Sequence, residues 1–160
     1  LLTLDHFKLI SDWYGLAILE LVTIIKEDWT PTLIAKRMRL SKIEAENAID
    51  RLLNLRLIEV TADGVYRRIA GTIMVHSKVS NEAIKNYYTG LHERSLDSLS
   101  SLTASEKVIG AQVFAFDPAQ IEDVREMADQ FLLQLNELAK KGKKRTEVYQ
   151  AFTNIFKVTE

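Results

Sequence analysis

The most regular pattern of apolar and polar positions lies between residues 42 and 55. Five apolar residues recur there at helical spacing and form one stripe, namely Ala45, Ala48, Ile49, Leu52 and Leu53. Ser41 precedes the stripe and Glu44 follows three residues later, which is the pattern of a capping box at a helix N-terminus. We therefore predict a helix over residues 42–55 with Leu52 and Leu53 buried.

The segments around this helix predict two more helices and a hairpin. Thr30-Pro31 combines a capping residue with a first-turn proline, so a helix is expected over residues 31–38. Residues 57–68 hold two apolar runs on either side of Asp63-Gly64, a dipeptide that favours hairpin turns. A broad apolar surface over residues 3–27 predicts one long helix beneath them. Helix, short turn, helix and hairpin is the order of a winged helix-turn-helix.

The second half of the chain predicts two long helices and a short sheet. Helical spacing runs through residues 80–102, and Asp117-Pro118 opens a second helix over 118–141. Residues 106–116 carry Val, Ile and Phe at both parities, which indicates a strand buried on both faces. Residues 146–158 indicate a second strand, so this half is expected to be a small α+β unit.

One apolar seam on the helix over 118–141 has alternating spacings of three and four residues: Ile121, Val124, Ala128, Phe131, Leu135 and Leu138. Such a seam packs either on a sheet or against another helix, and coiled coils need three or four heptads. DNA half-sites are usually read by symmetric dimers. We therefore expect a homodimer formed through this helix or through the helix over 3–27.

The predicted fold class is α+β and mainly helical. A winged helix-turn-helix with a long N-terminal helix is expected over residues 1–71. An α+β assembly or sensing unit, with two long helices and a short antiparallel sheet, is expected over 72–160.

Composition adds few constraints. The 160 residues are 47% hydrophobic and 27% charged with a formal net charge of −1, as in an ordinary globular domain. There is no cysteine, so disulfide and thiolate chemistry are excluded, which fits a cytoplasmic location. No apolar run is long enough for a membrane span, and we expect no membrane partner. The chain opens Leu-Leu-Thr-Leu rather than with Met, which indicates a piece of a longer protein.

Charge is distributed unevenly along the chain. Residues 30–70 contain eight Lys/Arg and five Asp/Glu, whereas residues 80–141 contain six Lys/Arg and ten Asp/Glu. Nucleic acid, if it binds, is therefore expected at the first half. Six basic side chains there are candidates for phosphate contacts, namely Lys36, Arg37, Arg39, Lys42, Arg67 and Arg68.

Asn47 and Arg51 are the candidates for reading bases, because both side chains make bidentate contacts to purines. Glu46 and Asp50 on the same helix face would be repelled by phosphates. The alternative is that the basic residues form a solvated helix face and a charged edge strand that blocks aggregation. In that case the winged helix is a packing or dimerisation unit that does not touch DNA.

Catalytic and cofactor patterns are missing from the sequence. His6, His76 and His92 lie far apart and have no carboxylates at ligand spacing, so no metal site is expected. No glycine-rich phosphate loop or nucleophile elbow is present, so we expect neither an enzyme nor a cofactor. The basic run over residues 140–145 complements a helix C-terminus or, alternatively, binds a phosphate-bearing ligand.

Several motifs together resemble one family. They are Trp13-Tyr14 with Leu19-Glu20-Leu21, Ile34-Ala35-Lys36-Arg37, the leucine pattern from Ala48 to Ile58, Asp63-Gly64-x-Tyr66, and Val148-Tyr149-Gln150 near Phe156. They are similar to the C-terminal part of DUF4423 proteins, a paralogous family of Fibrobacter also found in Bdellovibrio-type bacteria. Arg56 departs from the family pattern, in which a Gly is usual, and Phe156-Lys157 replaces a usual Phe-Pro.

The resemblance implies a bacterial transcriptional regulator whose full-length form has a further N-terminal helix-turn-helix of the phage-repressor type. It implies no catalytic residues and no defined ligand. The leading hypothesis is a regulator fragment whose winged helix contributes to binding double-stranded DNA or to assembly. The rival is an interaction, ligand-sensing or dimerisation module that does not contact DNA. The small-molecule or protein signal is left open.

Overall fold

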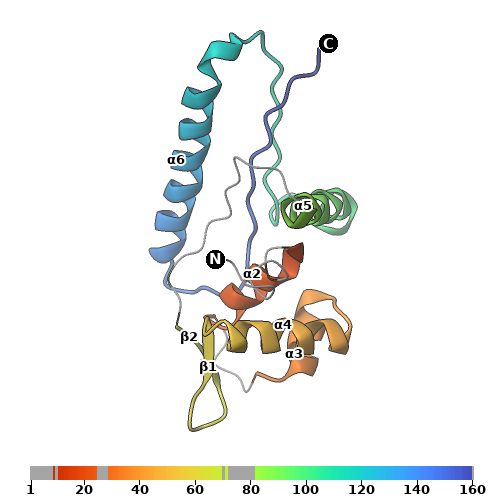
Figure 1. The fold of residues 1–160 in the computed structure, drawn as a ribbon, viewed down its shortest axis with the longest axis vertical. Coiled ribbons are helices and arrows are strands. Elements are labelled where there is room, and N and C mark those ends of the chain that lie inside the picture. Colours follow the sequence, from red (N-terminus) through yellow and green to blue (C-terminus); the bar gives the residue numbers. More distant parts are fainter. Residues whose placement is uncertain (1–8, 10, 25–28, 70, 72–81, 160) are drawn as a thin grey trace. The chain divides into compact units, whose positions relative to one another are not determined.

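A computed structural model of the chain describes residues 9, 11–24, 29–69, 71 and 82–159. These residues are mainly helical, with five helices and one two-stranded antiparallel hairpin (Figure 1). The chain divides into two compact units. Unit 1 comprises Leu1–Asp97 with Thr146–Val148, and unit 2 comprises Ser98–Arg145 with Tyr149–Glu160. The domain boundary predicted at residue 71 stays a prediction, because residues 72–81 lie outside the described ranges.

Unit 1 begins with the helices α2 (Trp13–Leu21), α3 (Pro31–Met38) and α4 (Lys42–Asn54). The capping signals of α3 and α4 are confirmed. The Thr30 hydroxyl accepts a hydrogen bond from the Leu33 amide at 3.1 Å. The Ser41 hydroxyl accepts one from the Glu44 amide at 3.2 Å, and the Ser41 amide donates to the Glu44 carboxylate at 2.8 Å. These contacts satisfy amides that have no partner within the helix.

The prediction of one uninterrupted helix over residues 3–27 is wrong. Asp12 has an extended backbone (φ −99°, ψ 120°), so α2 begins only at Trp13, and it ends after nine residues at Leu21. Aspartate competes with the helix for backbone hydrogen bonds and therefore favours such boundaries. Residues 3–8, 10 and 25–27 of the predicted range lie outside the described residues.

Both α3 and α4 end with an arginine in the left-handed conformation. Arg39 follows α3 with a φ of 55°, and Arg56 follows the last turn of α4 with a φ of 53°. The next residue then donates back into the helix, from the Leu40 amide to the Ala35 carbonyl and from Leu57 to Leu52, both at 2.9 Å. This is the Schellman arrangement, whose left-handed position is usually glycine. Arg56 therefore adopts a backbone conformation that glycine usually occupies.

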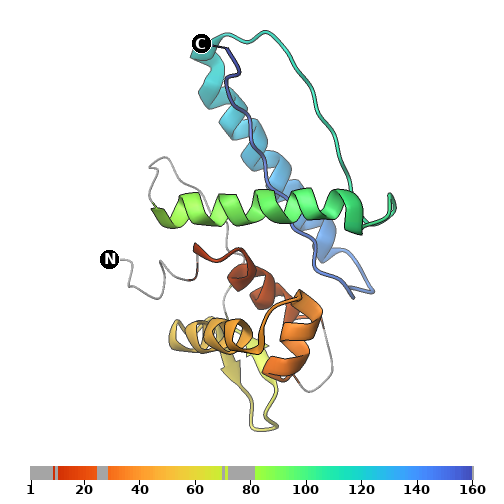
Figure 2. The same cartoon turned by 90° about the vertical axis from the view of Figure 1, so that its right-hand side faces the viewer.

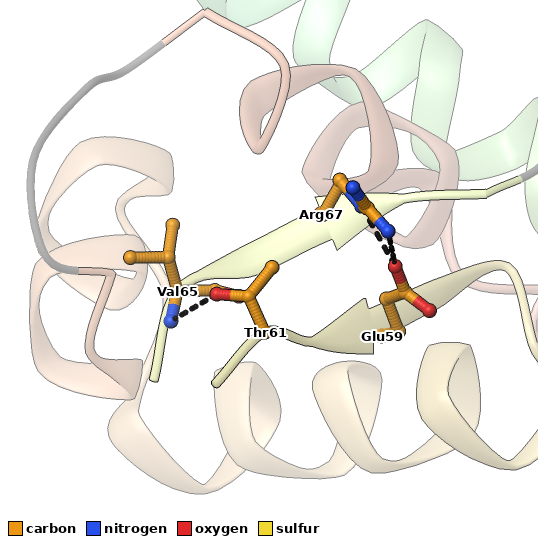
Figure 3. Close-up of polar contacts among 4 residues, drawn as sticks. All are labelled: Glu59, Thr61, Val65 and Arg67. Carbon is orange, nitrogen blue, oxygen red and sulfur yellow. Dashed lines mark hydrogen bonds and ion pairs between the residues drawn. The ribbon is translucent and has the colours of Figure 1, made fainter. Parts of the chain in front are cut away.

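The hairpin pairs β1 (Ile58–Val60) with β2 (Tyr66–Arg68), and Glu59 lies opposite Arg67. Its loop is Ala62-Asp63-Gly64, and Gly64 takes the left-handed φ of 78° that a three-residue hairpin loop requires. The Thr61 hydroxyl accepts a hydrogen bond from the Val65 amide at 3.2 Å and closes the base of the loop (Figure 3). The predicted turn at Asp63-Gly64 is confirmed.

One hydrophobic core holds these elements together. Leu52 of α4 is fully buried in this core, as predicted, whereas Leu53 is only half-buried. Trp29 closes the core from the segment before α3. The elements lie side by side in both views of unit 1 (Figures 1 and 2). The buried side chains are Leu9, Ile18, Leu19, Leu21, Val22, Trp29, Ile34, Ala35, Ala45, Ala48, Ile49, Leu52 and Ile58.

The first part of α5 (Glu82–Ser101) also belongs to unit 1 and packs on α2. Gly90 lies so close to Trp13 that an added Cβ would be 3.1 Å from the indole ring. The Arg94 guanidinium lies 4.7 Å from the centre of the same ring, a cation–π contact. Tyr87 and Leu91 are buried on this side of α5. Trp13 therefore joins α2 to α5.

Unit 2 contains the end of α5, the short 3₁₀ helix η1 (Pro118–Gln120) and α6 (Ile121–Lys140). Asp117 caps η1 by accepting a hydrogen bond from the Ala119 amide at 3.0 Å, so the predicted start signal is confirmed. At the end of α5 the Lys107 amine donates to three carbonyl oxygens, those of Ser98, Leu99 and Leu102, at 2.9, 2.7 and 2.8 Å.

The prediction of a short sheet in the second half of the chain is wrong. Residues 106–116 and 146–158 are described in full, and neither segment forms a strand. Strand pairing needs a backbone partner as well as β-branched side chains. Val108 and Val113, expected to be buried, are 101% and 90% exposed. The hairpin is thus the only sheet within the described residues.

Candidate nucleic-acid interface

The eight residues predicted to contact DNA all lie on α3, α4, the turn between them and β2. Lys36 and Arg37 lie in the last turn of α3, and Arg39 lies in the turn. Lys42 begins α4, and Asn47 and Arg51 follow on the same helix; Arg67 and Arg68 end β2. The short turn brings the end of α3 close to the start of α4, whereas β2 contributes its arginines from the hairpin.

Three of the eight side chains are unengaged among the described residues. Lys36, Arg39 and Asn47 are exposed, and their side chains form neither an ion pair nor a hydrogen bond with another described residue. Each can therefore contact a partner without first giving up an interaction within the chain. They come from the end of α3, the turn and the first half of α4.

Two further cations form exposed ion pairs. Lys42 lies 3.5 Å from the Glu46 carboxylate, one turn along α4. Arg37 lies 3.6 Å from the Glu147 carboxylate and donates a hydrogen bond to the Thr146 carbonyl at 3.1 Å. Solvent-exposed pairs of this kind contribute roughly 0–1 kcal/mol. Lys42 and Arg37 can therefore exchange their carboxylates for another anion at little cost.

Arg51 and Arg68 are held more firmly, and both turn toward α2. The Arg51 guanidinium binds the carboxylate of Asp12, and the side chain is only 20% exposed. The Arg68 guanidinium binds the carboxylate of Glu20 and is only 14% exposed. Removing one partner from a partly buried pair leaves the other charge poorly solvated. These two arginines therefore connect α4 and β2 to α2.

Arg67 forms a cross-strand pair with Glu59 on the exposed side of the hairpin (Figure 3). Its Nε donates to the Glu59 carboxylate at 2.7 Å, and a terminal guanidinium nitrogen donates to the same oxygen. The Arg67 side chain is 70% exposed. The pair thus neutralises one charge of the hairpin while leaving the guanidinium open to solvent.

Two tyrosines beside this surface have pKa values above the ordinary value. Burial raises the pKa of the Tyr14 hydroxyl, and the nearby Asp12 carboxylate raises it further. Burial also raises the pKa of Tyr66, with a contribution from Asp50. Both phenols therefore stay neutral. Two carboxyl side chains of α4 lie near Asn47, the half-buried Glu46 and the exposed Asp50.

The carboxylates that form ion pairs with the arginines were mostly not predictable from the sequence. Asp12, Glu20 and Glu147 lie 39, 48 and 110 residues from their partners, and no local pattern links such positions. Glu59 could have been found, because the hairpin register places it directly opposite Arg67.

No group of His, Asp and Glu side chains among the described residues could hold a metal ion. No helix among them is long and apolar enough to cross a membrane.

Comparison with known proteins gives one match. The sequence profile of DUF4423, a domain of unknown function, matches residues 1–158. No curated protein and no solved structure matches the chain. Because the profile covers nearly the whole chain, the protein belongs to the DUF4423 family.

Proposed function

We propose that unit 1 is a winged helix-turn-helix that binds double-stranded DNA as part of a bacterial transcriptional regulator. In this proposal α3 and α4 form the helix-turn-helix, α4 is the recognition helix, and the hairpin of β1 and β2 is the wing. The observation that carries the proposal is the group of exposed, unengaged side chains Lys36, Arg39 and Asn47 around the α3–α4 turn.

The state of each side chain suggests its role. Lys36 and Arg39 contact phosphates directly, and Asn47 offers its amide to a base edge. Three cations in exposed ion pairs exchange carboxylates for phosphates, namely Arg37, Lys42 and Arg67.

Arg51 and Arg68 take supporting roles in this proposal. Their partly buried ion pairs orient α4 and the wing against α2. Glu46 and Asp50 weaken attraction to phosphates. We therefore expect binding to depend strongly on salt and to be modest for this chain alone.

Arg39 and Arg56 provide a matched pair of variants for the test. Both are exposed arginines in the left-handed position after a helix, so Arg39→Gly and Arg56→Gly change the backbone in the same way. Only Arg39 belongs to the proposed interface. In a fluorescence-anisotropy titration with duplex DNA at about 50 mM salt, Arg39→Gly should weaken binding to all sequences. It should also reduce the salt slope by about one, while Arg56→Gly should match the parent chain.

Base reading is tested separately. Asn47→Ala should cost about 1–3 kcal/mol of discrimination between sites and little non-specific affinity. The absence of binding to random or operator duplex at about 50 mM salt would overturn the proposal. Equal losses in Arg39→Gly and Arg56→Gly would also contradict it, because the effect would then be one of charge or backbone alone.

A specific observation favours a second candidate, an interaction module that does not touch DNA. Five of the eight predicted side chains already bind carboxylates of the same chain, namely Arg37, Lys42, Arg51, Arg67 and Arg68. In that case the basic residues stabilise the fold. The anisotropy titration distinguishes the two candidates.

A further inference from the structure

The helix α6 leaves an apolar stripe open to solvent. Met127, Phe131 and Leu138 are 71%, 51% and 66% exposed, and with Gln134 they follow one another at spacings of four, three and four residues. They therefore share one face of the helix. No residue of α6 is buried.

The neighbouring face of α6 is already partly covered. Val124, Ala128, Leu132 and Leu135 are half-buried. The heptad seam therefore divides into a covered part and an open part. An open apolar stripe along a helix bordered by charges is typical of a protein–protein contact.

Charges at the two ends of the open stripe have opposite sign. Residues 121–131 contain four carboxylates and one arginine, whereas residues 136–145 contain five basic residues and one carboxylate. Several of these charges have no ion partner among the described residues, namely Asp123 and Glu126 at one end and Lys141, Lys143, Lys144 and Arg145 at the other. The helix dipole favours the same distribution, so the pattern alone does not identify a partner.

Two copies of this surface are complementary in charge when the two α6 helices run antiparallel. If Met127 of one copy lies opposite Leu138 of another, Phe131 lies opposite Gln134 by the same register. Asp123 then faces Gly142-Lys143, and Glu126 faces Ala139-Lys140. A parallel pairing would instead place acidic ends together and basic ends together, which is unfavourable.

We propose that α6 docks antiparallel onto α6 of a second copy of this chain, through the stripe of Met127, Phe131, Gln134 and Leu138. The contact is isologous, because the same patch serves both copies. Opposite charges at the two ends set its direction. The proposal is independent of the proposed DNA binding, since it concerns unit 2 residues and its tests contain no DNA.

Matched substitutions test the face. Phe131 and Leu133 are both exposed apolar residues of α6, but Leu133 points about 140° away from the centre of the stripe. In sedimentation equilibrium of the 160-residue chain, Phe131→Glu should raise the dimer dissociation constant by about tenfold or more. Leu133→Glu should change it by less than about twofold. A parent chain that stays monomeric at about 500 μM, or equal effects of both variants, would overturn the proposal.

Charge reversal tests the direction. Asp123→Lys with Glu126→Lys should weaken the dimer about tenfold at low salt, and adding Lys141→Glu with Lys143→Glu should restore it. In a parallel dimer, the reversal alone would keep like charges together and would have little effect. That result would overturn the antiparallel arrangement.

Cross-linking tests the register, and the absence of cysteine makes single-cysteine variants unambiguous. Residue 134 lies near the two-fold axis of the proposed dimer. Gln134→Cys should therefore form a disulfide with Cys at the same position of the second copy, whereas Leu133→Cys should not. Asp123→Cys and Lys141→Cys should fail alone, because identical ends are about 25 Å or more apart, and should cross-link when mixed. Efficient cross-linking of Asp123→Cys with itself would overturn the antiparallel proposal.

Discussion

The guanidinium of Arg51 on α4 binds the carboxylate of Asp12, the residue directly before α2. The two side chains are 20% and 32% exposed, so this ion pair is partly shielded from water. Asp12 also contacts the Tyr14 hydroxyl at the start of α2. The contact thus fixes the beginning of α2 against the last turn of α4.

A double-mutant cycle should detect this connection. Asp12→Ala and Arg51→Ala should each lower the free energy of unfolding by about 1–2 kcal/mol, and the double variant should lose about 1 kcal/mol less than their sum. The exposed Lys42–Glu46 pair is the control, with an expected coupling of about 0.3–0.5 kcal/mol. Urea denaturation provides the measurement. A coupling no larger than the control would show that Arg51 is effectively solvated.

Leu52 and Leu53 differ in burial, so they should contribute differently to the free energy of unfolding. Leu52→Ala should destabilise unit 1 by about 2–5 kcal/mol, because the side chain is fully buried and its removal leaves a cavity. Leu53→Ala should cost about half as much or less, since the side chain is half-buried. Both substitutions change helix propensity equally. Comparable losses for the two variants would contradict the register of α4.

Replacing a left-handed arginine by glycine should stabilise the fold. Arg56→Gly should raise the free energy of unfolding by about 0.5–1 kcal/mol, because a residue with a Cβ pays roughly 1–2 kcal/mol for this conformation. The loss of a favourable positive charge at the helix C-terminus and the flexibility of glycine in the unfolded chain offset part of the gain. Arg56→Ala removes the charge but keeps the strain, so it should give no increase. Thermal unfolding distinguishes the three chains.

The capping box of α4 should make stability depend on acid. The Ser41 hydroxyl and amide bond to the Glu44 carboxylate and hold the pKa of Glu44 below its usual 4.5. The folded state therefore binds this proton less readily than the unfolded state. The stabilisation is complete above pH 4.5 and is lost as the pH falls through the lowered pKa.

Ser41→Ala should accordingly cost about 1 kcal/mol at pH 7. Its deficit should shrink as the pH falls below 4.5, because the parent chain loses part of the same interaction. Unfolding curves between pH 3 and 7 test this, with Glu44→Gln as a control that has no carboxylate to titrate. A constant deficit across the range would show that the Ser41 hydroxyl does not contribute to lowering the pKa of Glu44.

Local signals predicted the starts of α3, α4 and η1 well. The caps at Thr30, Ser41 and Asp117 depend on residues within three positions of each other, so a short stretch of sequence contains the whole interaction. The turn at Gly64 is equally local. For the same reason, the bounds of α3 matched the prediction and those of α4 differed by one residue.

Interactions between distant parts of the chain were not predictable. The segments 106–116 and 146–158 have the composition of strands, but pairing depends on where another backbone lies. The same limit applies to the candidate interface. Charge and spacing selected Arg51 and Arg68 as DNA contacts, while the carboxylates that bind them come from residues 39 and 48 positions earlier.

The hydrogen bonds that the Lys107 amine donates at the end of α5 should also affect its chemical reactivity. An ammonium group has three N–H donors, and all three point at carbonyl oxygens of the last turn of α5 or just beyond it. Acylation removes two of these donors and the charge, so modification there would leave carbonyl groups without partners. Lys107 should consequently react with amine-labelling reagents far more slowly than Lys143 or Lys144. Slow labelling of Lys107 would show that its amine stays bound to the carbonyl oxygens at the end of α5.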